Sequence, residues 1–256
     1  DKILKINDKS TLDMTVEKAV KIIRGQKGTE VVLTILRDGW EDAKDFKIVR
    51  DTIVVPSLKW ELVKGNIAYL KLYQFSENAA SDFRKAAIEI LDSSADRIIL
   101  DLRNNPGGYL AVSQEIASWF LEKDKIVTIE DFGKNNEQEL YKAQGNEKLL
   151  PYPIVILINK GSASASEILA GALRDNRGIK LIGETSFGKG SVQEMEKLRG
   201  GSSLKVTVAK WLTPNGQSIS EKGLEPDIKV EITEEDEKAE KDSQLEIAIE
   251  IIKEMR

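Results

Sequence analysis

The first apolar pattern along the chain has the period of a helix. Four apolar residues recur at i, i+3, i+4 and i+7 and would share one helix face: Val16, Ala19, Val20 and Ile23. Thr15 precedes them as a suitable N-cap. Apolar and β-branched runs at residues 1–7, 31–37 and 46–49 indicate strands around this helix. Residues 1–50 therefore predict a small α+β domain.

The pattern changes after residue 50, where buried strands alternate with amphipathic helices. Residues 97–102 and 154–158 are nearly continuous apolar runs, as expected for strands that are covered on both faces. Further strands are predicted at three places: 66–73, 179–183 and 204–209. Helices with apolar inner faces are predicted at 83–91, at 110–121 and in a segment that ends at Leu173. This repetition predicts a layered α/β core over residues 51–232, with its working groups at strand-to-helix turns.

The last part of the chain, residues 233–256, is predicted to be a charged linker followed by a helix. Residues 233–242 are a run of mostly charged side chains. Four apolar residues occupy one face of the final helix: Leu245, Ala248, Ile249 and Ile252. Ile247 and Ile251 lie off that face, so the helix can pack on its own chain or contact a second subunit. A homodimer through this helix is therefore an open alternative.

Composition narrows the class of protein. Of the 256 residues, 41% are hydrophobic and 32% are charged, which is typical of a folded globular protein and not of a disordered or membrane-spanning one. The net charge of −5 gives no reason to expect nucleic-acid binding. The chain contains no cysteine, which excludes disulfides and thiolate metal sites.

Two polar motifs lie where chemistry is expected. Residues 161–167 (GSASASE) stand between a predicted strand and a predicted helix, where backbone N–H groups and the helix dipole can stabilise an oxyanion. Residues 188–193 (GKGSVQ) place Lys189 between two glycines. The chain has no histidine and no cysteine, so a serine nucleophile needs a carboxylate, a tyrosine or a lysine as its base. The combination predicts a Ser-Lys hydrolase.

The residues alone leave alternatives open. The serine-rich segment also has the composition of an ordinary helix N-cap, and its chemistry does not choose among Ser162, Ser164 and Ser166. The alternative interpretation of Lys189 is that it is an ordinary lysine in a surface loop. As a general base its amine must be neutral, which implies a dry pocket and a partner that holds the amine. Gln193 lies four residues later and could orient the amine through its amide oxygen.

A phosphate-binding loop is a rival interpretation of residues 183–189. The segment matches the first part of the P-loop pattern, but Gly190 occupies the place of the magnesium-binding Ser or Thr. Glu184 inside the loop would also repel phosphate. Nucleotide binding is therefore disfavoured. The turn at 104–108 (NNPGG) follows a buried strand, and its amides could supply a second oxyanion donor.

Several motifs in the same order resemble those of the carboxyl-terminal processing proteases, also called tail-specific proteases. The segments that carry the resemblance are 100–108, 159–175, 183–193, 212–216 and 223–228. The resemblance implies Ser164 as nucleophile, Lys189 as general base and Gln193 as the residue that orients the lysine. It also implies an oxyanion hole made by the backbone amides of Gly108 and Ala165. The implied fold is a ClpP/crotonase-like layered α/β core, and no metal or organic cofactor is implied.

The first 50 residues resemble the later part of a PDZ domain, with residues 15–24 as the helix beside its peptide groove. The strand and the carboxylate-binding loop that complete such a groove would precede residue 1. We therefore expect a partial PDZ-like domain that binds C-terminal peptides weakly or not at all. Asp175 matches an acidic position of some family members, and we expect its role to be structural.

The function implied by the resemblance is that of a serine endopeptidase. Its substrates would be proteins or peptides cleaved near exposed C-terminal tails, and its parent protein would be membrane-anchored in an extracytoplasmic space such as the periplasm or cell envelope. One alternative is a catalytically inactive, protease-like scaffold that binds peptides, which the complete Ser-Lys-Gln set disfavours. Another is an acyl-CoA enzyme on the related crotonase-like core, whose chemistry does not require this serine and lysine.

Overall fold

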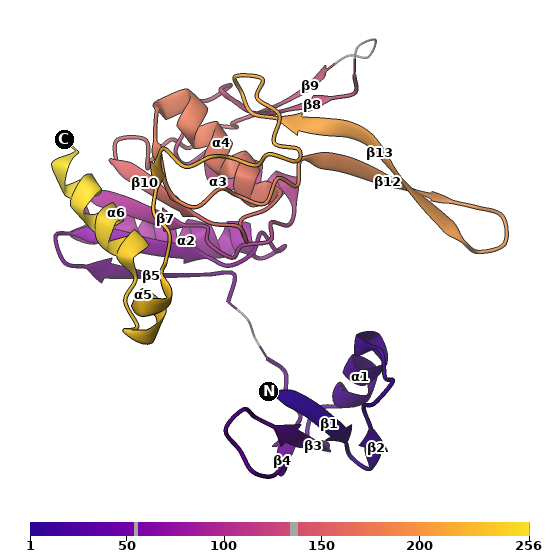
Figure 1. Cartoon of the computed structure of the whole chain (residues 1–256). Coiled ribbons are helices and arrows are strands. Elements are labelled where there is room, and N and C mark those ends of the chain that lie inside the picture. Colours follow the sequence, from indigo (N-terminus) through magenta and orange to yellow (C-terminus); the bar gives the residue numbers. More distant parts are fainter. Residues whose placement is uncertain (54–55, 134–137, 256) are drawn as a thin grey trace. The chain divides into compact units, whose positions relative to one another are not determined.

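The computed structural model describes residues 1–53, 56–133 and 138–255. The chain divides into two compact units, Asp1–Val55 and Pro56–Arg256 (Figure 1). Each unit contains buried apolar clusters of its own. Each unit therefore has the separate core that defines a domain.

The first unit is a four-stranded antiparallel sheet with one helix. The helix α1 (Val16–Ile23) begins after Thr15, whose hydroxyl accepts a hydrogen bond from the Lys18 N–H, so the predicted N-cap is confirmed. The strands lie in the order β2-β1-β3-β4. Their bounds are β1 (Lys2–Ile6), β2 (Lys9–Ser10), β3 (Glu30–Leu36) and β4 (Lys44–Val49).

Only two of the four apolar residues predicted to share one face of α1 pack against the core of this unit. Ala19 and Ile23 pack against the buried cluster of this unit, whereas Val16 and Val20 are 74% and 36% exposed. The buried members of that cluster are few: Ile6, Val31 and Leu33. A core this small gives a unit of about 55 residues little apolar burial to stabilise it.

The second unit is built on a six-stranded sheet in the order β14-β11-β10-β7-β6-β5. Only the β5–β6 pair is antiparallel, and the other neighbours are parallel. The apolar runs predicted as buried strands form β7 (Arg97–Asp101) and β10 (Ile154–Ile158), which occupy the middle of the sheet. The remaining strands are β5 (Leu58–Val63), β6 (Ile67–Leu72), β11 (Lys180–Gly183) and β14 (Ile228–Lys229).

Helices cover both faces of this sheet, as expected for a mostly parallel sheet (Figure 1). On one face the large core contains side chains of α2 (Ala79–Leu91), α3 (Leu110–Ala117) and α4 (Ala165–Arg177). Helix α3 ends four residues before its predicted end, because residues 118–121 continue as hydrogen-bonded turns. Helix α4 runs one turn past Leu173, and Gly178 ends it in the left-handed conformation (φ 65°).

The opposite face is covered by α6 (Ser243–Glu254), which is the predicted final helix. Ala248 and Ile252 are fully buried against the sheet, and Ile247 and Ile251 are half-buried against the same cluster. The apolar side of the helix is therefore used within its own chain. The predicted linker before it contains a short helix, α5 (Glu234–Lys238), which the charge pattern alone did not indicate.

A second, antiparallel sheet of four strands adjoins this core in the order β12-β13-β8-β9. Its bounds are β8 (Ile126–Asp131), β9 (Gln138–Lys142), β12 (Ser191–Lys197) and β13 (Ser203–Leu212). The sequence predicted only the middle of β13. Figure 1 shows the β12–β13 hairpin extending well beyond the other strands of this sheet. Among the described residues, no helix is long and apolar enough to cross a bilayer.

Candidate active site

The serine motif forms a sharp turn between β10 and α4. Ser164 is the residue immediately before α4, and its backbone angles (φ 56°, ψ −117°) are rare for a residue with a side chain. The turn is packed against the 104–108 turn, because a Cβ added to Gly107 would lie 2.8 Å from Ser164 Cβ and 2.9 Å from Ala165 N. A strained serine on a strand-to-helix turn is the arrangement of a nucleophile elbow.

The three serines of the motif differ in environment. Ser162 and Ser166 are fully buried, and their hydroxyls donate to the backbone carbonyls of Leu102 (2.8 Å) and Asn105 (2.9 Å). Both hydroxyls therefore hold the turn against the end of β7. Ser164 is only partly buried. It is the serine of the three that a substrate can reach.

Two backbone amides beside Ser164 have no acceptor within the described part of the chain. Ala165 N–H opens the first turn of α4. Gly108 lies opposite Phe75 in an isolated parallel bridge, in which Phe75 donates to Gly107 O (3.0 Å) and accepts from Tyr109 N–H (2.9 Å). These two bonds leave the Gly108 N–H directed away from Phe75. The two amides are thus available to an oxyanion.

The Lys189 loop is fixed through its backbone, while its side chain is exposed. Gly188 O accepts from Glu221 N–H (2.9 Å), and Gly190 O accepts from Trp211 N–H (2.7 Å). Among the described residues the Lys189 ammonium has no ion-pair or hydrogen-bond partner. The dry pocket expected around this amine is not formed in this structure, because the loop lies at the surface and no described side chain covers the amine.

Gln193 lies on β12 and is exposed. It follows an irregularity in the β12–β13 pairing between Val192 and Gln193. No hydrogen bond joins Gln193 to Lys189 in the described part of the chain. The structure thus brings together Ser164, Ala165 and the 107–108 turn, but not the side chains of Lys189 and Gln193.

Glu167 lies at the centre of the site, although the sequence analysis assigned no role to it. It is buried, and Oε2 of its carboxylate accepts from Ser164 N–H (2.8 Å) and from Lys189 N–H (3.0 Å). Its Oε1 accepts from the Ser186 hydroxyl (2.6 Å) and from Gly188 N–H (2.7 Å). One carboxylate therefore ties the serine turn to the lysine loop. The spacing Ser-x-x-Glu, typical of a capping box, was a signal for the bond to Ser164 but not for the bonds to the lysine loop.

A second buried network lies at the end of β7. The Asp101 carboxylate accepts from the Tyr69 hydroxyl (2.6 Å) and from the Arg103 guanidinium (2.8 and 3.0 Å). Arg103 also donates two hydrogen bonds to Asp242 (2.7 and 2.8 Å), the N-cap of α6. Burial by itself would raise the pKa of Asp242, but hydrogen bonds from Arg103 and Leu245 N–H lower it below its usual value. Arg103 thus links the 104–108 turn to the C-terminal helix.

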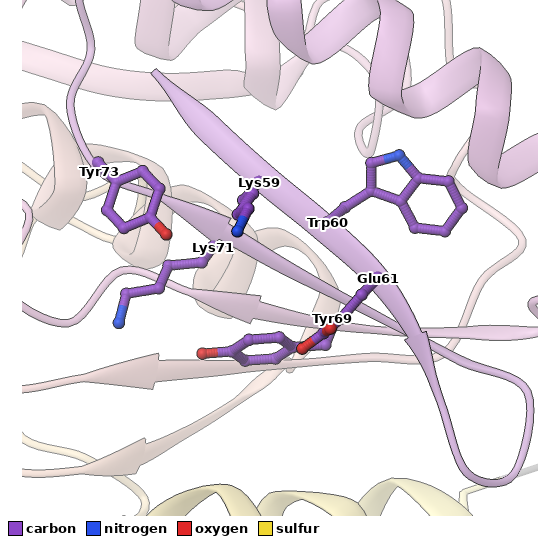
Figure 2. A pocket seen from close by; sticks show the side chains of 6 residues that line it. All are labelled: Lys59, Trp60, Glu61, Tyr69, Lys71 and Tyr73. Atoms are coloured by element: carbon purple, nitrogen blue, oxygen red, sulfur yellow. The ribbon is translucent and has the colours of Figure 1, made fainter. Parts of the chain in front are cut away.

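A pocket of about 230 Å³ lies on the α6 side of the sheet, over β5 and β6 (Figure 2). Figure 2 shows Tyr69 and Lys71 from β6, and Tyr73 just after that strand, beside Lys59 and Glu61 from β5. Lys71 lies 3.8 Å from Asp101, at the edge of the network described above. None of the site residues predicted from the sequence lines this pocket.

Asp175 lies near the end of α4. Its carboxylate accepts a hydrogen bond from Asn215 N–H (2.9 Å) and lies 3.7 Å from the Arg174 guanidinium. These contacts give Asp175 a structural role at the turn after β13. Among the described residues there is no group of three or more acidic side chains that could hold a metal ion.

A serine on a strand-to-helix turn, beside two free backbone amides, is an arrangement that serine hydrolases use. The model of peptidase family S41 matches residues 66–230, which include the serine turn and the lysine loop. The chain belongs to peptidase family S41.

Curated relatives agree with this assignment. The carboxy-terminal processing protease CtpA of Bacillus subtilis is 41% identical over 232 residues, which are 91% of this chain and 49% of that protein. A carboxy-terminal-processing protease of Bartonella bacilliformis is 44% identical over 236 residues, 90% of this chain and 54% of that protein. The chain spans about half the length of the curated relatives it matches.

Solved structures show the same mixed α/β fold. The photosystem II D1 C-terminal processing protease matches with a TM-score of 0.65 and 26% identity, covering 90% of this chain and 62% of that one. An S41 protease structure from Bacteroides fragilis matches with a TM-score of 0.66 and 14% identity, covering 99% of this chain and 73% of that one. Because its identity is only 14%, the second match shows similarity of fold and nothing further.

Proposed function

We propose that this chain is the peptidase portion of a carboxy-terminal processing serine endopeptidase. The observation that carries the proposal is the Ser164 turn: a partly exposed serine in a strained conformation, beside the free amides of Gly108 and Ala165. Glu167 supports it, because it holds the lysine loop within two hydrogen-bond lengths of the serine turn. The family relatives are named for carboxy-terminal processing.

The proposed reaction begins when Ser164 Oγ attacks the carbonyl carbon of a peptide bond and its proton passes to the neutral amine of Lys189. The amides of Gly108 and Ala165 donate to the resulting oxyanion. Collapse of this intermediate breaks the C–N bond, and Lys189 returns the proton to the leaving amine. A water molecule then attacks the acyl-enzyme ester with Lys189 as base, which frees the acid product and Ser164.

Lys189 must turn toward Ser164 in this reaction, because its side chain is exposed in the structure. We propose that bound substrate covers the amine and removes the water around it. Gln193 then accepts a hydrogen bond from the amine through its amide oxygen. The fixed backbone on both sides of Lys189 leaves only the side chain to move.

The finer features of the fold are also part of the proposal. The β10-turn-α4 arrangement and the layered sheet support a ClpP/crotonase-like core at residues 51–232, followed by the charged linker and helix at 233–256. The separate first unit supports a partial PDZ-like domain at residues 1–50. We propose proteins with accessible C-terminal tails as substrates and an extracytoplasmic location with a membrane-anchored parent, both from the family relationship alone. A homodimer through α6 remains a prediction for a measurement of molecular mass in solution.

A fluorophosphonate probe tests the proposed nucleophile. Ser164 is expected to label, and Ser164→Ala is expected to abolish both labelling and peptide hydrolysis without a change in the unfolding midpoint. The matched controls are Ser162→Ala and Ser166→Ala, which remove buried hydroxyls and are expected to keep measurable labelling. Label found on Ser166 would show that the wrong serine was chosen. A protein that binds peptide but neither labels nor hydrolyses would be the inactive scaffold.

A further inference from the structure

Two aromatic side chains near the serine turn are unusually exposed. Phe187 is 65% exposed and Tyr109 is 56% exposed, more than any other aromatic side chain in the described ranges. A single exposed aromatic residue needs no explanation. These two, however, adjoin the proposed catalytic groups: Tyr109 follows Gly108, and Phe187 stands two residues before Lys189.

The backbone around Phe187 holds its ring at the surface. Its N–H donates to Ser162 O (2.9 Å), which lies two residues before Ser164. The residues on either side, Ser186 and Gly188, both donate to the buried Glu167 carboxylate. These hydrogen bonds fix the backbone of Phe187, so the bond that carries the ring keeps its outward direction. The exposure of Phe187 is therefore fixed by the same network that positions the lysine loop.

Tyr109 is held in a similar way on the oxyanion side. Its N–H donates to Phe75 O (2.9 Å), and its carbonyl accepts from Ser113 N–H (3.2 Å) at the start of α3. The preceding Gly108 has a φ of 147°, and an added Cβ there would collide with the Phe75 carbonyl. The backbone that carries the Tyr109 ring is therefore rigid.

We infer that Phe187 and Tyr109 are two apolar walls of the substrate site, which hold large apolar side chains on the residues adjoining the cleaved bond. This inference rests on the proposed function, since it takes Ser164 as the attacking group. Both rings are carried by segments in contact with the serine turn, Phe187 through Ser162 and Tyr109 through the Gly107 contact with Ser164. Successive side chains of an extended peptide point to opposite sides, which suits one wall on each side.

Ring walls of this kind suit binding, because an aromatic side chain has few torsions to immobilise when a ligand covers it. The class of substrate follows from the walls. It is an extended peptide with leucine-like or aromatic residues on either side of the scissile bond, and small or charged residues there would leave the rings in water.

The inference is tested with two peptides. They differ only at the two residues adjoining the cleaved bond, which are both leucine in one peptide and both alanine in the other. The wild-type protein is expected to prefer leucine by about tenfold or more in kcat/KM, in line with apolar pockets in other enzymes. Phe187→Ala and Tyr109→Ala are each expected to lower that ratio several-fold, because the leucine peptide loses more apolar contact than the alanine peptide does. Phe187→Leu keeps an apolar wall and is expected to retain most of the preference. Ile88→Ala, which removes a 44% exposed apolar side chain on α2, is the matched control.

Ser164→Ala cannot turn the peptides over, so their dissociation constants can be measured. This variant is expected to bind the leucine peptide more tightly than the alanine peptide by the same ratio. An unchanged ratio in the wall variants, or an equal loss for both peptides, would overturn the inference. Absence of labelling and turnover in the wild-type protein would instead overturn the proposed function. The ratio of dissociation constants would still decide whether the walls bind apolar side chains.

Discussion

Replacing Glu167 with glutamine tests whether one buried carboxylate sets the geometry of the site. The carboxylate accepts four hydrogen bonds. Two of them come from the backbone N–H groups of Ser164 and Lys189, which share Oε2. The Ser186 hydroxyl and Gly188 N–H share Oε1. Glutamine keeps one acceptor oxygen and places an NH2 group at the other position. At least one of the four donors must then face another donor.

The orientation of the new amide can be worked out from the partners. An NH2 group at the Oε2 position would face two backbone N–H groups, neither of which can reverse. At the Oε1 position it would face Gly188 N–H and the Ser186 hydroxyl, and the hydroxyl can rotate to accept. Glu167→Gln is therefore expected to place its nitrogen at Oε1, where Gly188 N–H and the proton of the Ser186 hydroxyl both lose their carboxylate acceptor. Such a buried unpaired group costs about 1–3 kcal/mol of stability.

Glu167→Ala removes the acceptor of all four donors at once. We expect it to lower the free energy of unfolding by on the order of 3 kcal/mol or more, because several buried groups lose their partners together. It should also slow fluorophosphonate labelling of Ser164 strongly, since the serine turn then loses its carboxylate link to the lysine loop. Glu167→Gln should slow labelling less, because Ser164 and Lys189 keep their shared acceptor.

Urea unfolding and the rate of labelling measure the two effects on the same samples. Glu115→Gln is the matched control, because Glu115 is an exposed glutamate on α3 and should change neither quantity. If Glu167→Gln and Glu167→Ala both had the unfolding free energy and the labelling rate of the wild-type protein, the Glu167 link between the two loops would contribute nothing to stability or to reactivity. That result would refute the reasoning.

Three further predictions follow from other parts of the structure. Lys189→Arg should be as inactive as Lys189→Ala in peptide hydrolysis, because a guanidinium does not deprotonate, and EDTA should have no effect; a chelator-sensitive enzyme would contradict the Ser-Lys mechanism. The lowered pKa of Asp242 means that its bond to Arg103 stabilises the fold above about pH 3.9 and is lost as pH falls through the lower folded value. The protection factors of α6 amides, which correct for the intrinsic pH dependence of exchange, should accordingly fall on acidification, and Asp242→Asn should remove that dependence; protection factors independent of pH in the wild-type protein would argue against it. Amides of α1 should exchange faster than those of β10, and a C-terminal peptide should bind the first unit weakly; equal protection with micromolar, carboxylate-dependent binding would contradict this.

The elements predicted correctly from the sequence are those whose environment is uniform along the segment. The middle strands β7 and β10 are covered on both faces, so each is a continuous apolar run that local sequence displays. The hairpin β12–β13 is largely exposed, and its strands are held by pairing with each other more than by apolar burial. Residues 204–209 were still predicted as a strand, whereas β12 and the rest of the hairpin lacked a recognisable pattern.

The site was predictable in part for the same reason. The serine motif and the lysine loop have local signatures, but choosing among three serines depended on distant carbonyls that bind Ser162 and Ser166. The role of Glu167 depends on the lysine loop about 20 residues away, and the S-x-x-E spacing alone indicates only a helix cap. The exposure of Lys189 could not be read from its neighbours in sequence, because burial is set by what covers a loop.

The bond between Arg103 and Asp242 has a consequence for the order in which the molecule is made. The two residues are 139 positions apart, so at a synthesis rate of about 5–20 residues per second the guanidinium waits on the order of ten seconds for its carboxylate. Throughout that time one face of the growing sheet has no cover, and the turn beside Arg103 lacks its anchor. A nascent chain would therefore complete the Arg103 network beside the proposed oxyanion turn only after Ser164 and Lys189 have already been synthesised.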